Sequence, residues 1–458
     1  FCLSRGLGDV YKRQPSSSYS REARELLVGL LTSTSNFRDA LLLMESLEDP
    51  SETTRRLYPR MMYGRAAEFI NDGQLNRAEE LLDRILKDRY NAAVLPLAYF
   101  WKGEIAYRNN RLDDAIDFYQ KFLQTGSAGS GEATPREAAY NLGYCYLRKE
   151  NFNVALGYFQ KVVTRVSIAA PMLEQDAYVR LADCYFMQRN FKQALAMYQQ
   201  VLDFSWRSAD YALYQKAIIN GISNSKTKIE QLNTLQRLFP GSALITDANV
   251  EVAKTLMADQ RFREAIPYLN TVLNAPQATA FKPNALLQLG IAYYNLNRND
   301  EALAQYKRLL QQYPNSDEAG EALENIRTIY VETGKPEAYE DFVKSTGKAV
   351  SVSEADSLAY AAVETRLSDN DCNGAMPLLN AYITRFPQGQ KIIEAQYFRS
   401  ECFMQKKDWK NALSGYEFVA KQGSSRFAER SALVAARTFY FELMDYGKAQ
   451  PYYEILRS

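Results

Sequence analysis

The stretch LGIAYYNLNRNDEALAQY, residues 289–306, decides the fold, because its alanine at position 302 has a counterpart about every 37 residues. The spacings between neighbouring counterparts are 36 to 40 residues, apart from one interval of 71 that fits two units with a degenerate copy between them. This pattern predicts about twelve copies of one unit, rather than separate globular domains. The anchor alanines are Ala40, Ala78, Ala115, Ala155, Ala194, Ala265, Ala302, Ala338, Ala375, Ala412 and Ala449.

Residues of two sizes recur at fixed distances from the anchor alanine. A small residue lets two helix backbones approach closely, and a large side chain one turn further along fills the adjacent gap, so each copy is predicted to be a helical hairpin. Twelve residues before the anchor stand Ala66, Gly103, Gly143, Ala182, Ala253, Gly290 and Ser400. Four residues after it stand Tyr119, Phe159, Tyr198, Leu269, Tyr306, Phe342, Leu379, Tyr416 and Tyr453.

The start of the second helix in each hairpin carries its own signal. Asn and Asp side chains accept hydrogen bonds from the free N–H groups of a first helical turn. Such residues stand four positions before the anchor, so we expect the second helix to begin there. They are Asn36, Asn151, Asn190, Asp371, Asp408 and Asp445.

Together these positions resemble the tetratricopeptide repeat, in which Leu-Gly-x-x-Tyr is followed by a spaced alanine, an aromatic residue and a closing proline. The opening stretch matches it with Leu289, Gly290, Tyr293, Ala302, Tyr306 and Pro314. The resemblance covers about residues 21–458 and implies an all-α fold, an α-solenoid wound as a right-handed superhelix. This chain departs from the family in its period, which is nearer 37 than about 34, and in a sixth copy, residues 211–240, that lacks the anchor alanine.

Three copies close with an aromatic-proline corner, at LFPGS 238–242, YPNS 313–316 and RFPQG 385–389. Proline there ends the second helix and sets the turn into the next unit. These corners and the longer period resemble repeat modules of bacterial cell-envelope proteins, such as the periplasmic coordinator of the Tol-Pal system and outer-membrane assembly lipoproteins. The resemblance implies a periplasmic or cell-envelope location, with a cytoplasmic one as the alternative.

Composition excludes several function classes. The net charge is +1 and there is no run of five like charges, so we expect no nucleic-acid partner. The chain has no histidine, which removes imidazole from metal binding and acid-base catalysis. No stretch has the 18 or more apolar residues of a membrane-spanning helix.

Both ends of the chain look cut. It begins FCLSRGLGDVYKRQ without an initiator Met, and it stops within an amphipathic segment. We expect residues 1–20 to be a non-native or disordered head, and residues 21–458 to be a repeat array truncated at its C-terminus.

Three cysteines and a Gly/Ser-rich segment are candidates for chemical sites. Cys145, Cys184 and Cys402 each lie ten residues before an anchor, and equivalent positions on successive hairpins should be about 10 Å apart, too far for a disulfide. We therefore predict that they are small buried residues. The segment GSAGSGEATP, residues 126–135, lacks the Gly-Lys-Ser/Thr ending of a phosphate loop and is predicted to link two hairpins.

One face of the first helices is left as a candidate binding surface. In the family this side lines a concave groove, and solenoids present such grooves to extended peptides or partner helices. The positions for a carboxylate clamp hold no Lys with Asn, which disfavours binding of an acidic chaperone tail by that mechanism. The candidate groove residues, any one of which could instead be core, are Phe100, Glu104, Tyr107, Tyr140, Tyr144, Asp183, Tyr294, Tyr360, Glu364, Tyr397 and Glu401.

Two functional hypotheses follow. The first is a non-catalytic scaffold that binds a protein or peptide along the groove within a bacterial cell-envelope assembly, with no catalytic residue, cofactor or metal. The second is the repeat or regulatory half of a larger enzyme or signalling protein whose catalytic domain lies outside this sequence. The sequence leaves the partner and the oligomeric state open.

Overall fold

The structure, a computed structural model, describes residues 19–423 and 425–457, and within them every regular element is helical. This confirms the all-α prediction. The one extended pairing in this part of the chain is an isolated bridge between Ser130 and Ala133, inside the predicted linker 126–135. The proposed head falls mainly on residues 1–18, which lie outside the described residues.

The chain divides into two compact units, Phe1–Leu244 and Ile245–Ser458, with the boundary between two hairpins. The helices of the first unit are α2 (Ser20–Ser33), α3 (Phe37–Glu45), α4 (Glu52–Arg55), α5 (Tyr58–Asn71), α6 (Leu75–Lys87), η1 (Asn91–Ala93), α7 (Leu95–Arg108), α8 (Leu112–Gln124), α9 (Pro135–Arg148), α10 (Phe152–Val162), α11 (Met172–Met187), α12 (Phe191–Asp203), α13 (Ala209–Gly221) and α14 (Ser225–Leu238).

The second unit continues the same alternation. Its helices are α15 (Ile245–Ala258), α16 (Phe262–Asn274), η2 (Thr279–Phe281), α17 (Lys282–Asn295), α18 (Asn299–Gln312), α19 (Glu318–Glu332), α20 (Pro336–Ser345), α21 (Val352–Ser368), α22 (Cys372–Arg385), α23 (Ile392–Gln405), α24 (Trp409–Ala420), α25 (Ala428–Arg437), η3 (Thr438–Glu442) and α26 (Tyr446–Arg457).

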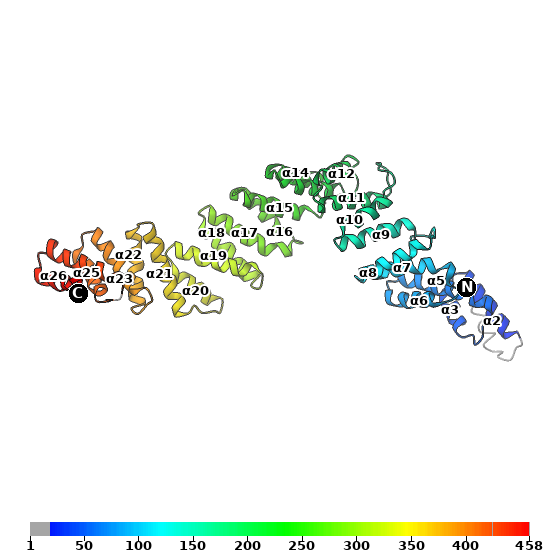
Figure 1. The fold of residues 1–458 in the computed structure, drawn as a ribbon, viewed down its shortest axis with the longest axis horizontal. Helices are drawn as coiled ribbons and strands as arrows, with labels where there is room; N and C mark the ends of the chain where they lie inside the picture. Colours follow the sequence, from blue (N-terminus) through cyan, green and yellow to red (C-terminus); the bar gives the residue numbers. More distant parts are fainter. Residues whose placement is uncertain (1–18, 424, 458) are drawn as a thin grey trace. The chain divides into compact units, whose positions relative to one another are not determined.

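Consecutive long helices pair as hairpins. Within each unit, a first helix packs against the second helix of its own hairpin, and that second helix packs against the next first helix, as α7, α8 and α9 do (Figure 1). The pairs α2/α3 to α13/α14 and α15/α16 to α25/α26 give twelve hairpins in the described residues, the predicted number. The degenerate sixth copy also forms one, α13/α14, with Asn224 capping its second helix.

The helix starts follow the predicted caps. The side chains of Asn36, Asn151, Asn190, Asp371 and Asp408 each accept a hydrogen bond from a backbone N–H in the first turn of the helix that follows. Asp445 accepts one from the backbone N–H of Lys448 in the same way. Each cap is preceded by a non-glycine residue with positive φ, such as Asn370 at 56° or Lys407 at 57°, which reverses the chain between the two helices.

The small and bulky positions meet inside each hairpin. A Cβ built on Gly290 would lie 2.2 Å from the ring of Tyr306, and one on Gly143 would lie 2.7 Å from the ring of Phe159. Both rings are buried, at 1% and 0% exposure. At these two positions the aromatic ring therefore lies directly on the backbone of the first helix, in space that a glycine leaves free.

This contact gives a stability prediction with an internal control. Gly290→Ala places a methyl group inside the Tyr306 ring and should lower the free energy of unfolding by about 1–3 kcal/mol. Gly320→Ala, on α19, meets nothing within 4 Å and should raise it by about 0.5–1 kcal/mol. Urea denaturation followed by circular dichroism measures both, and equal effects at the two sites would contradict the packing described.

Candidate functional site

All eleven predicted groove residues lie on first helices. In the first unit, Phe100, Glu104 and Tyr107 are on α7, Tyr140 and Tyr144 on α9, and Asp183 on α11; in the second unit, Tyr294 is on α17, Tyr360 and Glu364 on α21, and Tyr397 and Glu401 on α23. Their exposure separates them into groups with different roles.

Three of the aromatic residues are core side chains. Phe100, Tyr360 and Tyr397 are 3%, 3% and 4% exposed. Each packs edge-on against a ring of the second helix of its own hairpin: Phe100 against Tyr119 at 5.6 Å, Tyr360 against Tyr382 at 5.3 Å, and Tyr397 against Tyr416 at 6.0 Å between ring centroids. In this conformation these rings fill space between helices and have little surface to offer a partner.

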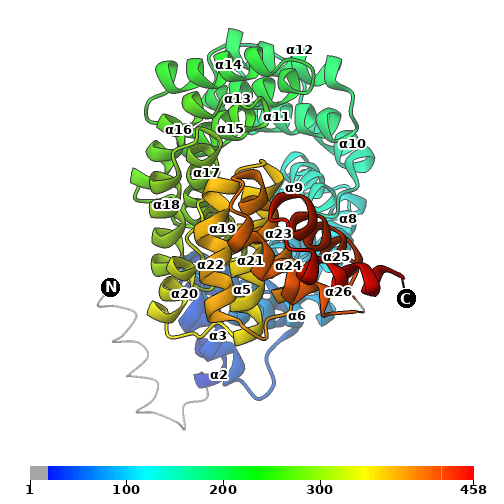
Figure 2. The ribbon, with the colours of Figure 1, turned by 90° about the vertical axis from the view of Figure 1, so that its left-hand side faces the viewer.

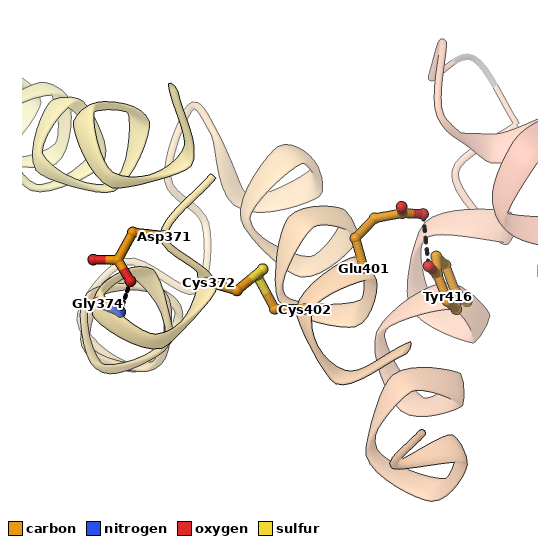
Figure 3. The surroundings of a disulfide bond; sticks show 6 residues. All are labelled: Asp371, Cys372, Gly374, Glu401, Cys402 and Tyr416. Carbon is orange, nitrogen blue, oxygen red and sulfur yellow. Dashed lines mark hydrogen bonds between the residues drawn. A yellow bond between two sulfur atoms is a disulfide. The ribbon is translucent and has the colours of Figure 1, made fainter. Parts of the chain in front are cut away.

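Three of the predicted carboxylates satisfy buried tyrosines. The hydroxyl of Tyr119 donates to Glu104 at 3.0 Å, that of Tyr198 to Asp183 at 2.5 Å, and that of Tyr416 to Glu401 at 2.7 Å, as Figure 3 shows for the last pair. In each pair the acid stands fifteen residues before the tyrosine. Burial, reinforced by the neighbouring carboxylate, raises the pKa of these tyrosines, so they remain hydrogen-bond donors.

The residue at this position differs in the other hairpins. Where the ring is Phe159, the position fifteen residues earlier is Tyr144, and where it is Leu379 that position is Glu364. Tyr306 has Ile291 there, and its hydroxyl interacts with Asn325 instead. Glu364 therefore has no tyrosine of its own to satisfy, and its side chain is exposed.

One polar network contains three of the predicted residues, Tyr140, Tyr144 and Asp183. Two residues that the sequence prediction missed, Asp176 and Arg180, join them. The hydroxyls of Tyr140 and Tyr144 donate to Asp176 at 2.7 and 2.5 Å. Arg180 donates to Asp183 at 2.5 Å, and Asp183 also accepts from Tyr211. Burial raises the pKa of Tyr140 to about 12. The network joins α9, α11, α12 and α13 and holds two partly exposed tyrosine rings in place.

The two remaining groove tyrosines are half-buried. Tyr294 donates its hydroxyl to both carboxylate oxygens of Glu332 at 2.8 Å, which links α17 to α19. The guanidinium of Arg148 lies over the ring of Tyr107, 5.1 Å from its centroid. Both tyrosines keep part of their surface accessible while they join neighbouring first helices.

The structure corrects the prediction for Cys402, which forms a disulfide with Cys372 (Figure 3). The prediction compared equivalent positions on successive hairpins, but Cys372 lies at the start of second helix α22 and Cys402 lies within first helix α23 of the next hairpin. These two helices pack directly, and the Cα atoms are 5.4 Å apart. At the Cys372 position other hairpins carry a ring, such as Phe152 or Trp409, which is why the sequence pattern concealed a cysteine pair.

Cys145 and Cys184 do lie buried as free thiols, as predicted. Burial raises the pKa of each thiol to about 12, so neither is a reactive thiolate near neutral pH. In the described part of the chain, no group of three or more His, Cys, Asp or Glu side chains is arranged to hold a metal ion. No helix there has both the length and the apolarity needed to span a bilayer.

Comparisons with known proteins agree with this architecture. Two family models described as tetratricopeptide repeat match the chain, one at residues 137–166, 176–203 and 284–316 and the other at residues 63–133. No curated protein matches it.

The solved structures that this chain matches include other repeat proteins. A tetratricopeptide repeat protein from Parabacteroides merdae has 18% sequence identity and a TM-score of 0.40, over 58% of this chain and 98% of that one. The C-terminal part of a TPR repeat-containing protein from Cytophaga hutchinsonii has 15% identity and a TM-score of 0.33, over 65% of this chain and 99% of that one. The apo form of RapI has 13% identity and a TM-score of 0.41, over 82% and 97%.

The matched segments coincide with hairpins of both units, and their small, aromatic and alanine positions are those that build the helix contacts described above. The chain therefore contains tetratricopeptide repeats in each of its two units.

Proposed function

We propose that this protein is a non-catalytic scaffold that binds a protein or peptide along the first-helix face of its hairpins, in a bacterial cell-envelope assembly. Tetratricopeptide repeats generally mediate protein–protein interactions, which supports the binding role. On the first-helix face, the partly exposed rings of Tyr140, Tyr144 and Tyr294 and the exposed Glu364 provide the mixture of apolar and polar surface common at protein interfaces.

The disulfide Cys372–Cys402 is the observation that carries the proposed compartment. Stable disulfides form and persist in oxidising environments such as the bacterial periplasm, and they are rare in the reducing cytosol. The aromatic-proline corners, which resemble those of cell-envelope repeat proteins, favour the same location. Both observations support the proposed location on the periplasmic side of the cell envelope.

The oxidation state of the cysteines tests the compartment. In protein isolated from its native host under alkylating conditions, mass spectrometry should find Cys372 and Cys402 cross-linked, with Cys145 and Cys184 as free thiols. Reduction should lower the free energy of unfolding of the C-terminal hairpins by about 3–4 kcal/mol, because the bond closes a loop of about 30 residues. The Cys372→Ser variant should show the same decrease in the free energy of unfolding. Reduction of this variant should lower that free energy no further. Recovery of both Cys372 and Cys402 as free thiols would contradict the proposed periplasmic location.

A charge-reversal pair tests the binding face. Glu364→Lys alters an exposed side chain without a tyrosine partner, so it should weaken partner capture while leaving the melting temperature unchanged. Glu401→Lys removes the acceptor of the buried Tyr416 hydroxyl and should cost about 1–3 kcal/mol of stability. Glu80→Lys, at an exposed position on second helix α6, is the control for added positive charge.

To measure partner capture, the purified protein is immobilised and incubated with a periplasmic extract of its host. Quantitative mass spectrometry then identifies the retained proteins. The proposed face is supported if the unaltered protein and the Glu80→Lys variant retain the same partners and the Glu364→Lys variant loses them. Equal retention by all three would show that binding, if present, uses another surface.

A further inference from the structure

A pocket of about 400 Å³ opens between first helices α15 and α17 of the second unit. Its lining includes Val250 and Met257 of α15, Leu269 and Val272 of α16, and Phe281 directly before α17. The three helices lie side by side in both ribbon views (Figure 1, Figure 2). The volume is within the range of small-ligand sites, about 300–1,000 Å³.

The pocket exists because this hairpin lacks rings that other hairpins have. Val250 stands fifteen residues before its anchor alanine, where other hairpins carry Phe100, Tyr140, Tyr360 or Tyr397. Four residues after the anchor, Leu269 replaces the tyrosine or phenylalanine of most other copies. Elsewhere these rings fill the space between helices. Here two aliphatic side chains leave that space open, so its shape and apolar walls suit an aromatic side chain supplied from outside.

The rim of the pocket carries hydrogen-bond donors. Among the lining residues, all in the described part of the chain, Lys254 is the only charged one, and its side chain is 76% exposed. Its ammonium nitrogen lies 3.9 Å from a carboxylate oxygen of Glu251. The carboxamides of Asn284 and Gln288, one turn apart on α17, also line the pocket. Lys254 stands at the position that holds Glu104, Asp183 or Glu401 in other hairpins. This hairpin has Leu269 in place of the tyrosine, so no hydroxyl needs an acceptor, and the charge at the position is positive instead of negative.

We propose that this pocket binds a partner polypeptide by seating one of its aromatic side chains, with the carboxylate of an adjacent acidic residue held by Lys254. Asn284 and Gln288 donate to the backbone carbonyls of the bound segment. This inference rests on the proposed scaffold function and names the chemistry of the partner at one point of the first-helix face. The aromatic ring completes the packing of the hairpin, and the acid complements the lysine.

The test is a selection of random peptides displayed on phage against the full 458-residue chain. The unaltered protein should enrich peptides with Phe, Tyr or Trp within two positions of Asp or Glu. The Val250→Tyr variant fills the pocket from within, and it should keep or raise the melting temperature while binding the selected peptides at least about tenfold more weakly. Val154→Tyr, at a 37% exposed valine on α10, is the matched control and should bind as the unaltered protein does.

A second variant tests the charge. Lys254→Glu should shift the enriched residue beside the aromatic one from acidic to basic, with no change in melting temperature, because Lys254 is exposed. An unchanged acidic preference in this variant would overturn the role of Lys254.

Three other outcomes would overturn the pocket assignment. If Val250→Tyr retains the selected peptides, they bind elsewhere, and the scaffold function stands without this pocket. If no sequence is enriched, the pocket does not bind peptides, and the scaffold function is judged separately by capture of host proteins. If sedimentation shows self-association of the unaltered protein that Val250→Tyr abolishes, the occupant is a second copy of this chain.

Discussion

The packing of several hairpins depends on one short contact, in which a ring of the second helix lies on the backbone of the first. The contact between Gly290 and Tyr306 leaves no room for a Cβ atom, and the same geometry is repeated at Gly103 and Gly143. This contact sets the distance between the two helices. It therefore also determines which helix faces are available to pack against the next hairpin. Ten of the eleven anchor alanines are 0% or 1% exposed, and only Ala338 is partly exposed. They extend the same close approach along the second helix.

The choice of ring has consequences for charge. A tyrosine buried at this contact brings a hydroxyl into the core, and leaving it without a partner would cost about 1–3 kcal/mol. In three hairpins an acid of the first helix accepts the hydrogen bond of this hydroxyl, namely Glu104, Asp183 and Glu401. Part of the negative charge on the first-helix face is thus a requirement of packing. Where the bulky residue of the second helix has no hydroxyl, this requirement is absent, and opposite Leu269 the position carries Lys254.

Much of the fold could be predicted from the sequence, because the contacts that build it are local and periodic. The anchor alanines, the caps such as Asn190 and Asp408, and the small-residue positions all lie within one hairpin and recur in register. The site was harder to predict, because periodicity identifies the face of a helix but not how deeply a ring is covered by its neighbours. Phe100 and Tyr397 stand at groove positions, yet both are buried. The bond between Cys372 and Cys402 joins two different positions of the repeat, so a comparison of equivalent positions could not find it.

Repeat arrays usually lose and regain structure one repeat at a time, since each repeat contacts only its neighbours. The bond between α22 and α23 removes that independence for two adjacent hairpins, because their 30-residue connection is closed by a covalent link. If the two ends of the protein were pulled apart, the segment between the two sulfur atoms could not lengthen while the bond is intact. The C-terminal part of the oxidised protein would thus transmit force through the bond, and this segment would remain a fixed length in an otherwise extensible chain.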